Sequence, residues 1–327
     1  MLAPFSPRSL FRVDARHRRA ANAPHQPGPR DHLMHPILIQ IGDSFFLGTY
    51  GLMIALGLLV AISLGSWRAR RRGLPPETLF DLSFVALVAG FAGARVLYII
   101  VEWDAFRADP MAMILSRTGF VFLGGFVAAA AACIVWIRRR GLPVTAVGDV
   151  AVPSLALAHA FGRIGCHLAG CCHGGVCNVP GLGIHVRRHF LPGNQGTFWN
   201  AYEAQIAEGL IAPGTPKSLA IWPTQLMESG GLFLLTGLLL CYARVQRRPG
   251  RVIALYLAGY AVLRFGLEFL RGDLGRGFVA GGLLSTSQAI SLAMLPVAAW
   301  IWWWSRDKAP NLAPPGPLRA AKPKAAP

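Results

Sequence analysis

Charged residues are scarce in this sequence of 327 residues: they make up 14%, against about a quarter in a typical soluble domain. Acidic side chains are the rarer sign, with 15 Asp and Glu against 32 Lys and Arg, and the formal net charge is +17. This composition excludes an ordinary soluble globule. The basic residues cluster between long apolar runs, which is typical of a membrane protein. We therefore expect a lipid bilayer, and not nucleic acid, as the partner of this charge.

The apolar runs predict transmembrane helices, each of which needs about 20 residues to cross a bilayer. Strict apolar–polar alternation, the pattern of membrane β-strands, is missing from them. The predicted fold class is therefore an all-α integral membrane protein with seven transmembrane helices. The predicted spans are 47–67, 79–101, 119–137, 146–168, 224–243, 251–271 and 283–304.

The charges of the loops predict the orientation. Arginine clusters follow spans one, three and five, and the C-terminal tail is basic, whereas the loop at 102–118 is net acidic. Because basic loops remain in the cytoplasm, we expect the N-terminus outside and the C-terminus in the cytoplasm. The long segment 174–222, between spans four and five, is then external.

The two ends of the chain differ from this membrane pattern. Residues 1–33 contain six arginines and no apolar core, so they do not form a signal peptide. We predict that they are a disordered or wrongly assigned extension and that translation starts at Met34. Residues 34–304 then form one seven-helix membrane domain, and residues 305–327, rich in Pro, Ala and Lys, form a disordered cytoplasmic tail.

Three arginines lie at one depth in the predicted spans. The sequence Arg-Arg-Arg-Gly-Leu-Pro at 70–75 recurs at 138–143, and the same offset aligns Arg95 with Arg163. This indicates a duplicated helical hairpin, and Arg264 lies at a similar depth in span six. A charge inside a bilayer costs about 2.5–3.5 kcal/mol even on a mild scale. Because arginine suits phosphate, we predict a cleft for a phospholipid head group. Snorkelling, or pairing with an acid one helical turn away, is the structural alternative.

A glycine-rich segment at 162–174 carries most of the candidate chemistry. Its glycines predict that span four breaks near its outer end. The cysteines follow a spacing of four intervening residues, not the two of common zinc sites, so we predict no metal and no other cofactor. A disulfide, or simple packing in the cleft, stays open for them. The thiols concerned are Cys166, Cys171, Cys172 and Cys177.

Together the polar segments resemble the bacterial prolipoprotein diacylglyceryl transferase family, from about His35 to Trp304. Their order and spacing carry the resemblance, since no single motif is diagnostic. The matching motifs are His-Pro-x3-Gln-x-Gly at 35–42, Tyr50-Gly51, Gly93-x-Arg95, Gly162-Arg163-x-Gly165, Pro223-x-Gln225-Leu226-x-x-Glu228 and Tyr260-x3-Arg264-x3-Glu268-x2-Arg271.

The resemblance implies an enzyme, a multi-pass protein of the bacterial cytoplasmic (inner) membrane. It implies transfer of diacylglyceryl from phosphatidylglycerol to the lipobox cysteine in the signal peptide of a prolipoprotein. Arg163 and Arg264 are then expected to hold the lipid phosphate, with Tyr260 and Glu268 arranging Arg264. The further candidates for substrate binding are Arg95, Tyr50, Gln225 and Glu228.

The sequence departs from the family where the substrate thiol is activated. The His-Gly-Gly motif of span three is here Leu123-Gly124-Gly125, so the histidine assigned to that step is missing. Further replacements of family His, Asn and Glu residues are Trp222, Cys166, Ala169 and Cys171.

Two histidines are candidates for the missing base. We predict that His167, one helical turn from Arg163, takes the thiol proton, with His173 as the other candidate. The alternative is a phospholipid-binding relative with different thiol or redox chemistry at the cysteine cluster.

Overall fold

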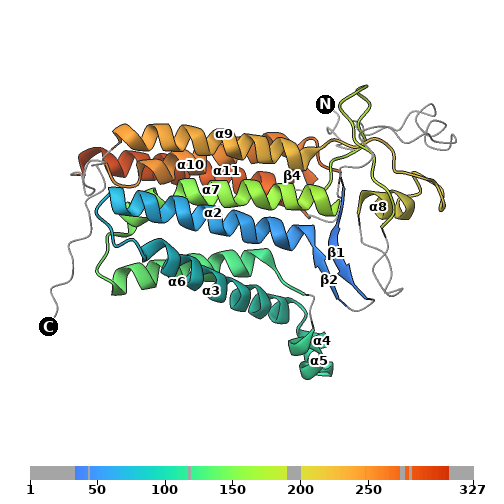
Figure 1. The fold of residues 1–327 in the computed structure, drawn as a ribbon, viewed down its shortest axis with the longest axis horizontal. Helices are drawn as coiled ribbons and strands as arrows, with labels where there is room; N and C mark the ends of the chain where they lie inside the picture. The colour runs from blue at the N-terminus through green and yellow to red at the C-terminus, as the bar shows by residue number, and fades with distance from the viewer. Residues whose placement is uncertain are drawn as a thin grey trace. The chain divides into compact units, whose positions relative to one another are not determined.

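The computed structural model describes residues 34–42, 45–116, 119–189, 200–246, 248–272, 277–279 and 282–308. The predicted extension at 1–33 and residues 309–327 of the predicted tail lie outside the described residues. Each predicted span overlaps one long helix (Figure 1). The long helices are α2 (Thr49–Arg71), α3 (Thr78–Val101), α6 (Phe122–Arg139), α7 (Val144–Ala169), α9 (Thr224–Val245), α10 (Arg251–Glu268) and α11 (Thr286–Trp304).

The protein is mostly helical, and five of these helices, α2, α3, α6, α7 and α9, are long and apolar enough to cross a membrane. Of the other two, α10 carries the charged residues Arg251, Arg264 and Glu268, and α11 begins with the polar residues Thr286, Ser287 and Gln288. The number of seven spans and their orientation stay predictions.

Short elements that the apolar pattern did not predict join the long helices. β1 (Ile37–Ile41) and β2 (Phe45–Gly48) form an antiparallel hairpin that leads directly into α2, and β3 (Phe278–Val279) pairs with β4 (Leu284–Ser285) before α11. Residues 37–41 do not show the apolar–polar alternation that indicates a β-strand, because four of these five residues are apolar. The remaining helices are α4 (Trp103–Ala108), α5 (Pro110–Leu115), α8 (Ala201–Ala207) and the 3-10 turn η5 (Ser305–Asp307).

The described chain divides into two compact units. The first consists of residues up to 61 together with 155–241 and 254–303, and the second consists of 62–154, 242–253 and the residues from 304 onward. The candidate active site lies within the first unit.

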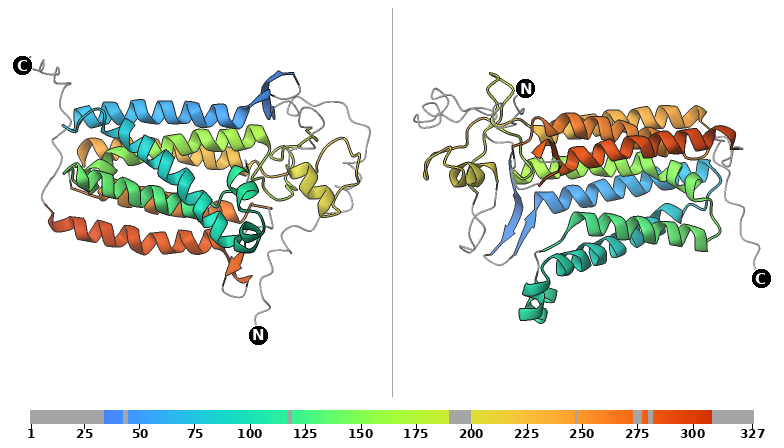
Figure 2. Two further views of the ribbon diagram at one scale, coloured as in Figure 1. Left: turned by 90° about the horizontal axis from the view of Figure 1, so that it is seen from below. Right: turned by 180° about the vertical axis from the view of Figure 1, so that it is seen from behind.

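In the second unit, α3 and α6 lie side by side (Figures 1 and 2). Glycines bring their backbones together: a Cβ on Gly93 would lie 2.6 Å from the carbonyl oxygen of Gly124. In the same unit the carboxylate of Asp149 accepts the backbone N–H groups of Gly250 and Ile253 at 2.7 and 3.0 Å. Asp149 therefore caps the start of α10, a helix distant from it in sequence.

In the first unit, the predicted external segment 174–222 folds around its own apolar core, as far as the structure describes it. This core includes Val186, Tyr202 and Ile221, packed with Met34. The Tyr202 hydroxyl donates to the carbonyl oxygen of Thr215 at 2.7 Å. The segment is thus a folded unit and not an open loop, although residues 190–199 lie outside the described range.

Close approach of α2 and α7 positions the site. A Cβ on Gly57 would lie 2.7 Å from Cβ of Phe161, and one on Gly165 would lie 3.1 Å from Tyr50. The predicted break of α7 occurs after Ala169, because Gly170 adopts a left-handed φ of 75°. The helix nevertheless continues through Gly165, where a larger residue would collide with α2.

Candidate active site

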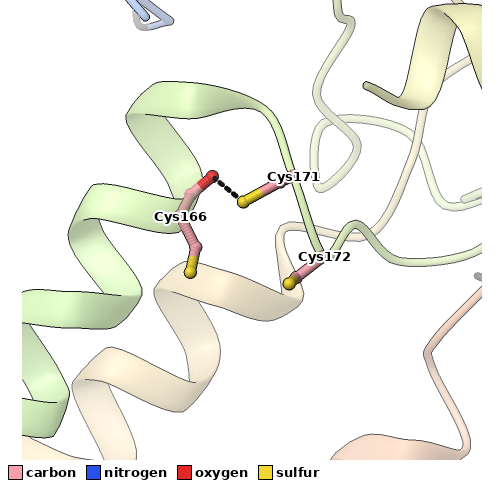
Figure 3. A group of neighbouring side chains, drawn as sticks. All are labelled: Cys166, Cys171 and Cys172. Atoms are coloured by element: carbon pink, nitrogen blue, oxygen red, sulfur yellow. Dashed lines mark hydrogen bonds between the residues drawn. The ribbon is translucent and has the colours of Figure 1, made fainter. Parts of the chain in front are cut away.

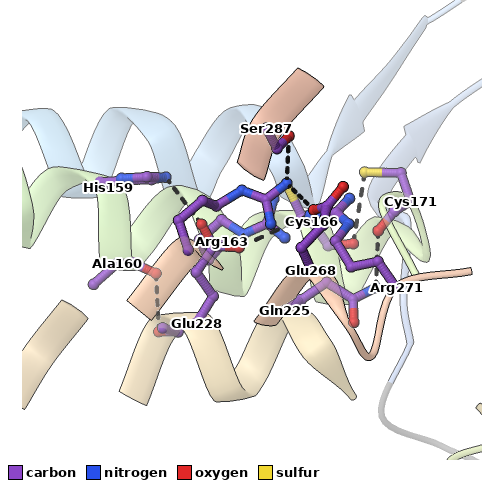
Figure 4. A network of polar contacts seen from close by, with 12 residues as sticks. His159, Ala160, Arg163, Cys166, Cys171, Gln225, Glu228, Glu268, Arg271 and Ser287 are labelled. Atoms are coloured by element: carbon purple, nitrogen blue, oxygen red, sulfur yellow. Dashed lines mark hydrogen bonds and ion pairs between the residues drawn. The ribbon is translucent and has the colours of Figure 1, made fainter. Parts of the chain in front are cut away.

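Glu228, one turn into α9, is the centre of a buried network of charges (Figure 4). It is 2% exposed, and its carboxylate lies 3.0 Å from Nε of Arg163. The Tyr260 hydroxyl donates to the same carboxylate at 3.4 Å. His159 and Arg271 lie farther away, at 3.7 and 3.9 Å. The Glu228 carboxylate therefore contacts side chains from α7, from α10 and from the segment after α10, and it orients them.

A second ion pair holds Arg264 within α10. Its Nη2 lies 2.6 Å from the carboxylate of Glu268, one turn along the helix, and also donates to the Ser287 hydroxyl of α11 at 2.9 Å. The pairing at four-residue spacing is the one that the sequence indicates. Ser287 was missed, because a single serine at a helix start carries no sequence signal of binding.

The two arginines have buried N–H groups that the described residues leave without a hydrogen-bond acceptor. These are on Nη2 of Arg163 and Nη1 of Arg264. Buried donors without a partner are rare in proteins, so each one requires an explanation. The network contains three guanidinium groups and two carboxylates, which gives a net charge of +1 with His159 counted as uncharged. This surplus of positive charge among the ion-paired side chains is suited to an anion.

Two hydrogen bonds attach α9 to α7 around this network. The Ser229 hydroxyl donates to the carbonyl oxygen of Ala160 at 3.0 Å, and the Gln225 amide donates to the carbonyl oxygen of Cys171 at 2.8 Å. Gln225 is fully buried. The sequence-predicted pair Gln225 and Glu228 thus has two roles, since Gln225 holds the segment after α7 and Glu228 holds the arginines.

Three of the four predicted thiols form one group at the end of α7 (Figure 3). The sulfur atoms of Cys166, Cys171 and Cys172 all lie within 4.8 Å of one another. Nη1 of Arg163 contacts the Cys166 sulfur at 3.7 Å, which connects the thiols to the charge network. Cys177 does not belong to the group; it lines a separate hollow of about 360 Å³. All six cysteines are free thiols.

The environment of Cys172 favours its thiolate. Hydrogen bonds from the Cys166 and Cys171 thiols lower the pKa of Cys172, and the positive charges of Arg163 and Arg271 lower it further. Spacing in the sequence did not predict this group. The backbone reverses at Gly170 and at Cys172, whose φ values are 75° and 55°, and this brings sulfurs together that an extended segment would keep apart.

His167, the predicted base, is buried at 3% exposure. Neither ring nitrogen has a hydrogen-bond partner among the residues that the structure describes. His173, the other candidate, has Nδ1 3.1 Å from the carbonyl oxygen of Gly174. The predicted role of His167 as a base stays a prediction.

Arg95 belongs to the second unit, where backbone carbonyl oxygens surround its guanidinium group. It donates to Gly119 at 2.8 Å, to Ser116 at 3.1 Å and also to Met113. These carbonyl oxygens accept hydrogen bonds from a half-buried guanidinium group. Among the described residues, the third guanidinium group of the network belongs to Arg271 and not to Arg95. The predicted role of Arg95 in substrate binding stays a prediction.

The fold and the site define a class: a mostly helical integral membrane protein with a buried network of ion pairs among its helices. The chain belongs to the prolipoprotein diacylglyceryl transferase family, whose sequence pattern matches residues 36–304.

Individual relatives carry the corresponding enzyme name, phosphatidylglycerol–prolipoprotein diacylglyceryl transferase. The one from Clostridium tetani is 35% identical over 269 residues, which are 82% of this chain and 97% of the relative. A second, from Clostridium perfringens, is 34% identical and covers 79% of this chain and 91% of its own length. One from Legionella pneumophila is 31% identical over 84% of this chain and 98% of its own. These names favour the transferase over a phospholipid-binding relative with different thiol or redox chemistry at the cysteine cluster.

Proposed function

We propose that this protein transfers diacylglyceryl from phosphatidylglycerol to the lipobox cysteine thiol of a prolipoprotein signal peptide. The observation that carries the proposal is the pair of buried N–H groups on Arg163 and Arg264 without an acceptor in the described structure. The phosphodiester of phosphatidylglycerol is a monoanion, and it balances the charge of +1 that we count for the network. Its oxygens also suit the planar fork of an arginine.

The charge of the departing group explains why two arginines are needed. The substrate sulfur attacks the glycerol carbon, the carbon–oxygen bond breaks, and its electron pair remains on the phosphate oxygen. The phosphate then becomes a monoester and gains a second negative charge. Fixed guanidinium groups at this point stabilise the transition state more than the bound lipid. Glu228 and Glu268 hold Arg163 and Arg264 in place before the lipid binds.

The proposal extends to the membrane arrangement and to the remaining candidates. In this proposal the chain crosses the bacterial inner membrane seven times and the charge network faces the exofacial side, where exported precursors present their thiols. Tyr50, beside Gly165, and Gln225 lie next to the thiol group, and Arg95 is kept as a candidate for lipid binding on its sequence position alone. His167 is the side-chain candidate for accepting the thiol proton.

Complementation tests the proposal. A bacterial strain depleted of its own transferase is supplied with this protein, with Arg163→Gln, or with the control Arg188→Gln. Arg188 pairs with Glu203 outside the network, at 2.8 Å, and its side chain is 45% exposed. We expect growth and a lipoprotein mobility shift from the unchanged protein and from the control, and neither from Arg163→Gln.

Purified protein provides the decisive measurement. It should transfer radiolabelled diacylglyceryl from phosphatidylglycerol vesicles to a lipobox peptide. A folded protein that neither rescues growth nor labels the peptide would refute the proposal.

A further inference from the structure

The three sulfur atoms at the end of α7 have the geometry of a metal site. Zinc–sulfur bonds of about 2.3 Å at tetrahedral angles place neighbouring sulfurs about 3.8 Å apart. The sulfurs of Cys166, Cys171 and Cys172 lie within 4.8 Å of one another, so an ion requires them to close by about 1 Å at most. Cys166 lies in the last turn of α7, and side-chain rotation of Cys171 and Cys172, which follow the helix, accommodates such a change. We propose that these three cysteines bind a zinc ion.

The backbone around the group is arranged for this convergence. Cys172 adopts a φ of 55°, a left-handed conformation that costs a non-glycine residue about 1–2 kcal/mol. Residues kept in such conformations cluster at functional sites. The buried Gln225 amide holds the carbonyl oxygen of Cys171 at 2.8 Å, which fixes the segment between the second and third sulfurs. Thiols that merely fill space need neither feature.

The number and type of ligands indicate the kind of ion and its role. Thiolates select soft or borderline ions such as zinc and disfavour magnesium and calcium. Structural zinc sites have four protein ligands, whereas catalytic sites have three and leave one position open. Among the described residues the group contains three. The open position therefore takes an external ligand, and the proposed function supplies one, the lipobox thiol.

Zinc-bound hydroxide at this place accepts the thiol proton, the role for which His167 is the side-chain candidate. The substrate thiol displaces zinc-bound hydroxide, which leaves as water with the thiol proton, and the sulfur becomes a zinc-bound thiolate. This sulfur attacks the glycerol carbon, and the electron pair of the broken carbon–oxygen bond goes to the phosphate. The neutral thioether is a weak ligand and leaves. The zinc ion does not change oxidation state, and no oxidant is required.

Arg163 connects the two halves of this reaction. Its Nη1 lies 3.7 Å from the Cys166 sulfur, while its Nη2 has no acceptor within the described part of the chain. One guanidinium thus contacts the metal ligands and presents an N–H group to the lipid phosphate. This brings the bound thiolate close to the carbon that carries the phosphate.

Metal analysis of the full-length protein, purified in detergent without chelators, tests the inference. We expect about one zinc ion per chain, since one group of three thiols is present. Cobalt(II) substitution should produce the absorption of tetrahedral cobalt thiolate, and a lipobox peptide should change this spectrum while its serine analogue does not. These signals do not require turnover.

Variants identify the ligands. Cys166→Ser, Cys171→Ser and Cys172→Ser should each weaken zinc binding by at least the roughly 10–100-fold that even outer-shell changes cause. Cys172→His, which keeps a zinc ligand, should retain the metal. The matched control is Cys241→Ser, an exposed thiol outside the group, which should retain both zinc and transfer.

The inference rests on the proposed function, but the two fail in different ways. Zinc-free protein that transfers diacylglyceryl at full rate, in the presence of a strong zinc chelator, overturns the metal site and leaves the transferase intact. The same holds if thiol counting finds two of the three cysteines joined as a disulfide in the active protein. A protein that binds zinc and the peptide thiol but never forms a thioether overturns the transferase and leaves the metal site.

Discussion

Replacing Arg264 with lysine separates charge from geometry in the anion site. In the structure Nη2 of Arg264 is occupied by Glu268 at 2.6 Å and by Ser287 at 2.9 Å, while the buried Nη1 remains for the substrate. A lysine ammonium keeps the positive charge and the contact with Glu268. It cannot at the same time present a second, fixed N–H group to the phosphate.

The expected size of the effect follows from this lost donor. Removal of one preorganised donor to a developing charge lowers turnover by about 10²–10³, or ~2.7–4 kcal/mol. We expect Arg264→Lys to lose activity in this range, mainly in kcat, because the phosphate gains its second charge only in the transition state. Ser287→Ala is the matched control. It removes one hydrogen bond that the same guanidinium donates to an uncharged hydroxyl, but it leaves Nη1 and the ion pair with Glu268 in place, so we expect a smaller loss of kcat than in Arg264→Lys.

The assay is peptide labelling from phosphatidylglycerol vesicles at several lipid concentrations, with thermal stability in detergent measured in parallel. The stability measurement distinguishes a damaged site from a damaged fold. If folded Arg264→Lys retains a third or more of the kcat, the second N–H group has no part in catalysis, and the reasoning from the unpartnered donors is wrong.

Two further changes test the packing around and beyond the site. Glu228→Gln leaves Arg163 buried without its carboxylate, so we expect the free energy of unfolding, measured by denaturation in detergent, to fall by about 3–5 kcal/mol. The control is Glu208→Gln at an exposed position, which should not change stability. Equal stability of the two variants would refute the central role of Glu228. Gly93→Ala forces α3 and α6 apart, because its Cβ would lie 2.6 Å from a carbonyl oxygen, and should cost about 1–3 kcal/mol. Gly51→Ala, with open space around it, is the control, and an unchanged melting temperature for Gly93→Ala would contradict the close contact.

The helices and one ion pair follow from short-range regularities, and these were predicted correctly. Hydropathy over about 20 residues located all seven long helices, because a bilayer-spanning segment must be apolar along its own length. The pair of Arg264 and Glu268 follows from helical spacing alone. The family resemblance, which depends on the order of motifs, is confirmed by the match over residues 36–304.

The packing of helices decided which side chains distant in sequence come into contact. A local sequence pattern carries no information about this packing. Glu228 was predicted as a general substrate contact, yet it is the acid that holds Arg163. Arg271, and not Arg95, completes the described network, because Arg95 finds carbonyl acceptors in its own unit. The cysteines have a spacing unlike that of common zinc sites, and only left-handed turns after α7 bring three sulfurs together. Such turns change the direction of the chain within one residue, so spacing along the sequence does not measure the distances that result.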